Sequence, residues 1–315
     1  MERADGILRR IADEHDVRFD SIEQVQDGSC VMSKRKSKRV ECFELARQQR
    51  ASGQQNIGYT SRPFISCGLP VRRCKDARFT RRNGQFKLEI TGSQEFGLPF
   101  GQDRLVVIWL ATEAVRRHTR LIGFRSAAEI LDAFELPKDG KSYGRLVAAF
   151  QRISTAQMSF SSDGSTMHPV WGFERVTFVD KARIWYARDV HQLTLPGGFE
   201  NRILLSSSFW DEITHHKIPL ELAVAGGLSD SPAILDFYCW IVWRANGLKK
   251  QTGVPLHSLK EQLGISDKTS LRQFRYQVRK WLKTIEAIWP ECRASIMTDG
   301  TKLLLHHGKA IQDRA

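Results

Sequence analysis

A row of basic side chains follows one face of the segment from residue 268 to residue 283. Its cations recur at positions i, i+4, i+7, i+11 and i+15, which is the spacing of one side of a helix. The row and its two polar neighbours are Lys268, Ser270, Arg272, Arg275, Tyr276, Arg279 and Lys283. No acidic residue occurs within the segment, so the row lacks the i,i+4 ion pairs of an ordinary solvated helix. A one-signed row of this kind is typical of a surface that binds nucleic acid.

The two kinds of cation in this row suit different chemistry. The guanidinium group forms two hydrogen bonds to the O6 and N7 atoms of guanine, so Arg272, Arg275 and Arg279 are the candidates for reading bases. Lys268 and Lys283 stand near the ends of the row and suit contacts to phosphate. The alternative is a solvated basic face with no partner.

A second, thinner set of polar and basic side chains lies between residues 138 and 152. It comprises Lys138, Lys141, Ser142, Tyr143, Arg145 and Arg152. Asp132, Glu135 and Asp139 come close before it and reduce its positive field. Two interpretations stay open for this set: contact with DNA, or packing against another protomer.

The sequence around the first row predicts the elements that hold it. A heavily apolar segment predicts a buried helix, two capping serines predict the starts of two further helices, and a turn dipeptide predicts a hairpin. The expected elements are a helix over 231–245, a helix opened by Ser258 and ending at Gly264, a long helix capped by Ser266, and strands over 294–297 and 302–306 joined at Asp299-Gly300. The expected core face of the long helix is Leu271, Phe274, Val278, Leu282 and Ile285.

The same order of elements occurs once earlier in the chain. The expected elements there are a helix over 103–118, a strand over 121–124, a helix capped by Ser126, a helix with the buried stripe Leu146, Val147, Phe150 and Ile153, and strands over 158–161 and 167–179. A helix, a capped helix, a turn, a longer helix and a hairpin make a winged helix-turn-helix. The sequence therefore predicts an α+β protein with two tandem winged helix-turn-helix domains.

The domain organisation follows from composition. Residues 1–94 are poor in apolar residues, acidic at first and then basic from Lys34 to Arg39, and predict a flexible basic, partly disordered N-terminal arm. The arm is either a solvated tail or a further DNA contact. The two expected domains are residues 95–195 and 199–307, divided at Leu195–Gly198 and followed by a tail over 308–315.

Composition bounds the function classes. The net charge of +13 indicates a polyanionic partner. No segment has the length and composition of a signal peptide or a membrane span, so a cytoplasmic protein without a membrane partner is expected. The adjacent pairs His215-His216 and His306-His307 and the six scattered cysteines lack metal-ligand spacing. We therefore expect no catalytic residues, no metal and no cofactor.

Five segments carry a resemblance to a known family. Phe96–Arg104, Ile108–Thr112, Phe124–Leu131, Leu136–Lys141 and Phe150–Ile153 resemble the RepA-type replication initiators of bacterial plasmids. The likeness is sharp from about residue 95 to 153, looser to about residue 305, and absent from the first ninety residues.

This resemblance implies a specific function. Similar initiators bind direct repeats, called iterons, in double-stranded origin DNA through two winged-helix domains, of which the C-terminal one is the principal reader. They help to open the adjacent DNA, recruit the host initiator and the replicative helicase or its loader, and control copy number. They exist as homodimers in equilibrium with monomers. The resemblance thus implies a bacterial, DNA-associated protein.

Two other functions compete with this interpretation. A winged-helix transcriptional repressor without a direct replication role would use the same fold, since fold does not fix function. A nicking enzyme of the rolling-circle kind would need two histidines that alternate with apolar residues to hold a metal, and no such motif occurs. No P-loop occurs either, which disfavours initiation driven by ATP.

Overall fold

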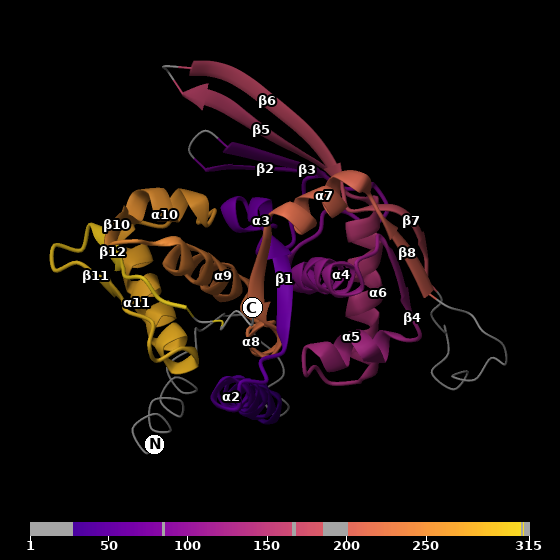
Figure 1. The fold of residues 1–315 in the computed structure, drawn as a ribbon, viewed down its shortest axis with the longest axis horizontal. Coiled ribbons are helices and arrows are strands. Elements are labelled where there is room, and N and C mark those ends of the chain that lie inside the picture. The colour runs from indigo at the N-terminus through magenta and orange to yellow at the C-terminus, as the bar shows by residue number, and fades with distance from the viewer. Residues whose placement is uncertain (1–27, 84–85, 166–167, 185–200, 310, 312–315) are drawn as a thin grey trace.

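The structure is a computed structural model, and it describes residues 28–83, 86–165, 168–184, 201–309 and 311. For residues 28–37, 162–165 and 168–176 it describes the backbone but not the side chains. The described part combines helices with four small sheets, an α+β arrangement (Figure 1). Within it, no helix has the length and apolar composition needed to cross a membrane.

The N-terminal region contains regular structure. Its elements are α2 (Gly28–Ala51), β1 (Ile57–Ser61), α3 (Arg62–Ser66), β2 (Arg78–Asn83) and β3 (Phe86–Thr91). Phe43 of α2 and Leu88 and Ile90 of β3 are fully buried in the core. The prediction of a flexible arm over residues 1–94 is therefore wrong for the described part of that range. The physical reason is that these strands gain order from partners far along the chain, which local composition does not report. Residues 1–27 lie outside the described part.

The middle of the chain follows the predicted order of elements. They are η1 (Gly101–Asp103), α4 (Arg104–Arg117), β4 (Leu121–Phe124), α5 (Ala127–Ala133), α6 (Gly140–Thr155), β5 (Gln157–Ser165), β6 (His168–Thr177) and β7 (Val179–Arg183). Helix α4 is buried on almost every side, and its Trp109 packs edge-on against Phe124 and Phe150. These contacts join α4, β4 and α6 into one core.

Strand pairing crosses the predicted domain boundary. β8 (Asn201–Leu205) pairs antiparallel with both β4 and β7, in the order β4-β8-β7. β9 (Lys217–Glu221) pairs with β1, so that Ile57 lies opposite Glu221. The predicted division at Leu195–Gly198 lies outside the described residues, but the segment after it is not part of a separate C-terminal domain. β8, α7 (Ser207–His215) and β9 complete the N-terminal unit because β1, β4 and β7 need them as partners.

The N-terminal β-hairpin extends the hairpin that follows α6. The four-stranded sheet runs in the order β2-β3-β5-β6 with every pair antiparallel. Its inner face packs against α3, where the rings of Phe64 and Phe160 lie 6.1 Å apart. In Figure 1 this sheet forms the upper edge of the molecule, above α3 and α7.

The C-terminal unit begins after the short helix α8 (Leu222–Gly227). Its elements are α9 (Pro232–Gly247), β10 (Thr252–Pro255), α10 (Leu256–Gln262), α11 (Leu271–Ile288), β11 (Ala294–Ile296) and β12 (Lys302–Leu305). The three strands form a sheet in the order β10-β12-β11. Phe237 of α9 and Phe274 of α11 both contact the ring of Trp281, which joins the helices in one core.

Two predicted helix starts in this unit are wrong. α10 begins at Leu256, so Ser258 lies within the helix and does not cap it. α11 is capped by Ser270 and not by Ser266, whose hydroxyl instead accepts a hydrogen bond from the backbone of Lys268. The side chain of Leu271, expected in the core, is 47% exposed because it occupies the first position after this cap.

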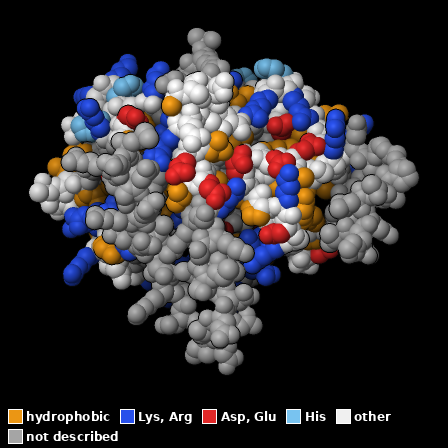
Figure 2. Space-filling view, turned by 90° about the horizontal axis from the view of Figure 1, so that it is seen from below, with side chains coloured by type: hydrophobic (Ala, Val, Ile, Leu, Met, Phe, Trp, Pro, Cys, Tyr) orange, Lys and Arg blue, Asp and Glu red, His pale blue; other side chains and the backbone are white. Residues whose placement is uncertain are grey.

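Charge is unevenly distributed over the surface. On the face seen from below Figure 1, Asp and Glu side chains gather near the middle, and Lys and Arg side chains lie at several places around them (Figure 2). The net positive charge is therefore not spread evenly over this face, and a cationic site has to be located from individual residues.

Candidate nucleic-acid interface

Helix α11 separates an apolar face from a basic one. Ser270 caps the helix through a capping box, in which its hydroxyl accepts from the Gln273 backbone and the Gln273 side chain accepts from the Ser270 backbone. One side of the helix is buried through Phe274, Val278 and Ile285. The opposite side therefore faces solvent, as the amphipathic pattern predicts.

The predicted row lies on this exposed side, with two qualifications. Arg272, Arg279 and Lys283 are exposed on the helix, and the Tyr276 ring is 62% exposed. Lys268 is also exposed but lies in the turn before the helix. Ser270 is the helix cap, so its hydroxyl is already engaged with the backbone.

Arg275 lies in a different setting from its neighbours. It is only partly exposed, and its guanidinium packs on Gly300 in the turn between β11 and β12. A Cβ added at Gly300 would stand 2.5 Å from Arg275 Cζ, and the φ angle of +68° there also favours glycine. Arg275 therefore ties α11 to the hairpin, which corrects the prediction of a freely exposed base reader.

The turn that receives Arg275 has its own charge arrangement. Hydrogen bonds from the backbone and hydroxyl of Thr301 lower the pKa of Asp299, with smaller contributions from Lys302 and Arg275. The deprotonated Asp299 attracts the neighbouring cations Lys302 and Arg275. Charged side chains of the hairpin tip and of α11 therefore lie next to each other.

Lys280 is a further cation on α11, outside the row predicted from the sequence. Its ammonium group lies 4.9 Å from the ring centroid of Tyr276, a cation–π contact across one helical turn. The i,i+4 spacing of the two residues was the available signal. The contact holds both side chains along the exposed side of the helix.

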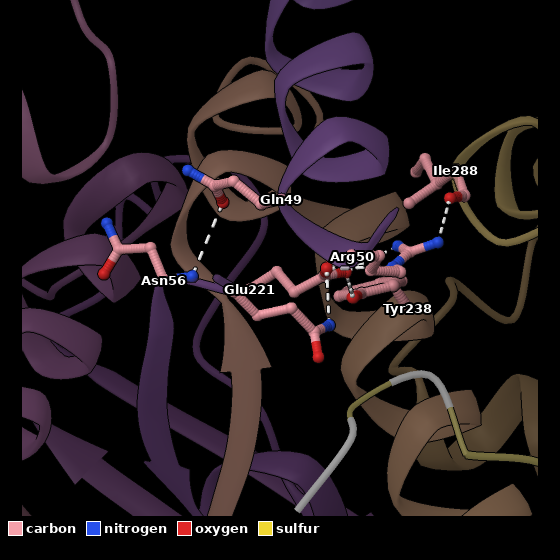
Figure 3. A network of polar contacts seen from close by, with 7 residues as sticks. Gln49, Arg50, Asn56, Glu221, Tyr238 and Ile288 are labelled. Atoms are coloured by element: carbon pink, nitrogen blue, oxygen red, sulfur yellow. Dashed lines mark hydrogen bonds and ion pairs between the residues drawn. The ribbon is translucent and has the colours of Figure 1, made fainter. Parts of the chain in front are cut away.

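A buried polar network fixes the far end of α11. Glu221 at the end of β9 is fully buried and accepts two hydrogen bonds from Arg50 of α2, at 2.9 and 2.5 Å (Figure 3). Tyr238 of α9 donates a third at 3.0 Å, and burial raises the pKa of this phenol well above its ordinary value. Arg50 also donates to the carbonyl of Ile288, the last residue of α11, at 2.6 Å. The network joins α2, β9, α9 and α11, so the basic helix is anchored to the N-terminal unit.

The N-terminal set is divided between surface and structural roles. Lys141 and Arg145 are exposed on α6, and Lys138 pairs with Asp132 at 2.7 Å. The backbone amide of Ser142 donates to Asp139, the N-cap of α6. The Tyr143 side chain is partly buried against the core.

Arg152 is not part of an exposed basic face, contrary to the prediction. Its guanidinium forms two hydrogen bonds to the buried carboxylate of Asp103, at 2.6 and 2.8 Å. It also lies over the Phe100 ring, 4.8 Å from the centroid. Helical spacing placed Arg152 with the other cations, but it is paired with Asp103, which lies 49 residues away in the chain.

The exposed cations of α6 line a groove of roughly 940 Å³. Apolar side chains form part of its wall, including Leu131 of α5, Phe134 directly after α5, and Leu146 of α6. Further cations from α2 and the loop after α3 line it, namely Lys38, Arg39, Arg72 and Arg73. In the sequence these four residues belong to the predicted N-terminal arm, and only the fold brings them beside α6.

The described residues give little support for nucleophilic or metal chemistry. Within this part of the chain, no group of three or more His, Cys, Asp or Glu side chains is arranged to hold a metal ion. Burial raises the pKa of the Cys42 and Cys67 thiols to about 11, which disfavours their reactive thiolate form.

The fold and the surface together define an α+β protein that presents a basic helix, α11, on a body joined by buried arginine contacts. Residues 57–220 match the family described as "Replication initiator protein A". Because the match covers more than half of the 315 residues, the chain belongs to this family of replication initiators. The resemblance noted from the sequence is thereby confirmed.

Solved structures share the fold. The chain is similar to a crystal structure of domains 2 and 3 of RctB, with a TM-score of 0.55 and 12% identity over 79% of this chain and 98% of that one. A second crystal structure of RctB domains 2-3 matches with a TM-score of 0.49 and 12% identity, over 77% of this chain and 94% of that one. No match to a curated protein was found.

Proposed function

We propose that this replication initiator binds double-stranded origin DNA, with α11 as the principal reading helix. The observation that carries the proposal is the exposed row Arg272, Arg279 and Lys283, which no acidic residue of α11 before Lys283 interrupts. A helix that carries such a cationic row and is anchored at its far end suits insertion into the major groove.

We interpret the C-terminal unit as a winged helix. The order α9, β10, α10, α11 and then the hairpin β11-β12, with β10 paired to β12, supports this interpretation. The N-terminal unit has the same order through α4, β4, α5, α6 and the hairpin β5-β6. It departs from the simple pattern because β4 pairs with β8 while the hairpin pairs with β3.

The details of initiation rest on the sequence resemblance. We propose that the target is a set of iterons in a plasmid origin, and that binding promotes opening of the adjacent DNA. The proposal includes recruitment of the host initiator and the replicative helicase or its loader, copy number control, and a homodimer in equilibrium with the monomer. It places the protein in the bacterial cytoplasm, associated with DNA.

Selection of DNA fragments followed by footprinting at two salt concentrations tests this proposal. The full-length protein is mixed with fragments of its own replicon, and bound fragments are mapped. Protection of regularly spaced direct repeats, weakened steeply by salt, supports binding at iterons. No preference over random duplex would overturn the proposal.

A transcriptional repressor is the second candidate because it would use the same helix. It predicts protection of a single palindrome at a promoter, and it predicts that no helicase-loading protein joins the complex. A pull-down on the protected DNA with purified host replication proteins separates the two candidates.

We also propose that binding involves no catalytic step by this chain. Incubation with supercoiled origin plasmid and Mg²⁺ or Mn²⁺ tests this part, since a nicking enzyme would convert the plasmid to a relaxed form. A relaxed product would contradict it.

A further inference from the structure

The four-stranded sheet has one face that the core does not use. Side chains alternate along a strand, so Phe79 and Arg81 of β2 point inward with Leu88 and Ile90 of β3. The residues between them point to the other side. We call this the outer sheet face and define it by Arg78, Thr80, Arg82, Lys87, Glu89, Thr91, Gln157, Ser159 and Ser161.

The nine side chains that define the outer sheet face are polar, and three of them are cationic. The strand register places three rows across it: Arg82, Lys87 and Ser161 in the first, Thr80, Glu89 and Ser159 in the second, Arg78, Thr91 and Gln157 in the third. Apart from Glu89, every side chain in these rows has a cationic, hydroxyl or amide group that can donate a hydrogen bond to an anion. The polar side chains of β2, β3 and β5 give this part of the sheet no reason to be covered by a further protein layer.

Cations surround the carboxylate of Glu89 on the outer sheet face. Lys87 lies 2.8 Å from Glu89, and its hydrogen bond is the main reason why the pKa of Glu89 is lowered. Arg78 and Arg82 lower it further through their charges. Cations therefore dominate the surroundings of Glu89 on this face.

The same sheet is packed against the helix pair that ends in α11. Arg81 points inward from β2, and its guanidinium lies on Gly264 in the turn between α10 and α11. Arg82, the next residue, is exposed on the outer sheet face, while Lys268 is exposed in that same turn. Exposed cations therefore lie close in sequence to both partners of the contact between Arg81 and Gly264.

We propose that the outer sheet face binds the phosphate backbone of the duplex whose bases α11 reads. This inference rests on the proposed function and deepens it by assigning a second contact surface. Arginine and lysine with serine and threonine hydroxyls are the groups that commonly contact DNA phosphates. The hairpin β2-β3 would thereby lengthen the bound DNA segment beyond the part that faces α11.

Paired alanine variants of the full chain test this proposal. The test variant is Arg78→Ala with Arg82→Ala, and the matched control is Lys181→Ala with Arg183→Ala. The control removes two exposed cations from β7, a strand of a different sheet, so the net charge changes equally. Affinity for the selected fragment is measured between about 50 and 200 mM salt, with hydroxyl-radical footprints of each complex.

The proposal predicts a smaller salt dependence for the test variant only. Loss of two phosphate contacts lowers the slope of log K against log salt by about 2, and protection disappears at one flank while the central positions stay protected. An unchanged slope and flank, or an equal change in the control, would overturn the assignment of this surface while DNA binding itself stands. If the wild-type chain shows no preference for any fragment, the proposed function fails and this inference fails with it.

Discussion

The guanidinium of Arg81 lies directly on the backbone of Gly264, in the turn that leads into α11. A Cβ at Gly264 would overlap this group, and the φ angle of +62° lies in the left-handed region that favours glycine. Arg81 is itself buried on the inner face of β2. The contact joins the turn before the basic helix to the N-terminal sheet. Position 264 requires glycine for two reasons, the positive φ angle and the space that Arg81 occupies.

We predict that Gly264→Ala destabilises the protein by about 1–3 kcal/mol, because it combines backbone strain with the overlap on Arg81. Chemical denaturation measures the loss. Gly144→Ala in α6 is the matched control, since no atom lies within 4 Å of a Cβ added there. A helical glycine in open space should gain about 0.5–1 kcal/mol on the same change. Equal effects at both sites would contradict the role of the Arg81 contact.

The buried pair Arg50–Glu221 gives a second prediction. Glu221→Gln removes one charge from a fully buried site and leaves Arg50 uncompensated, so we expect a loss of about 3–5 kcal/mol. The exposed pair Lys38–Glu41 serves as the control, and Lys38→Ala should change stability by about 1 kcal/mol or less. Urea titration of both variants checks the contrast.

Local patterns sufficed for α4, α6, α9 and α11 and for the strands β4, β11 and β12, but not for α2, the N-terminal strands or some side-chain partners. α4, α6 and α11 repeat apolar residues at helical spacing, so their existence could be predicted. β1 and β3 are short and depend on strands far along the chain, as the pairing of Ile57 with Glu221 illustrates. Arg152 shares the spacing of the surface cations, and only the fold shows that it forms a salt bridge with Asp103.

Replacing two arginines of α6 should affect two different quantities, the stability of the protein for Arg152 and the salt dependence of DNA binding for Arg145. Arg152→Ala leaves the buried Asp103 without its partner, and we expect a loss of stability of about 3 kcal/mol. Arg145→Ala changes an exposed side chain, so stability should stay within about 0.5 kcal/mol. If α6 also contacts DNA, the salt slope falls by about 0.9 for Arg145→Ala. Thermal unfolding and DNA titrations of the same two samples provide both readouts.

The cap of α6 predicts a pH dependence. Hydrogen bonds from Ser142 lower the pKa of Asp139 in the folded protein below its ordinary value of 3.8. The stabilisation is therefore present above that ordinary pKa and is lost as the pH falls through the lower folded pKa. Asp139→Ala should cost about 1 kcal/mol at pH 7, and the difference from wild type should shrink at low pH. Denaturation at neutral and acidic pH measures it; a constant difference would contradict the role of the charge.

The exposed cations of α11 should separate into base readers and phosphate contacts. Arg279→Ala should weaken binding to the selected fragment by about 1–3 kcal/mol and relax the base preference, with unchanged stability. Lys283→Ala should weaken specific and random duplex alike and mainly lower the salt slope. Arg275→Ala should instead lower the stability, because Arg275 packs on Gly300 and ties α11 to the hairpin. Competition titrations with specific and random duplex, beside thermal unfolding, distinguish the three. Equal losses on both duplexes for Arg279→Ala would show that this residue contacts the backbone and does not read a base.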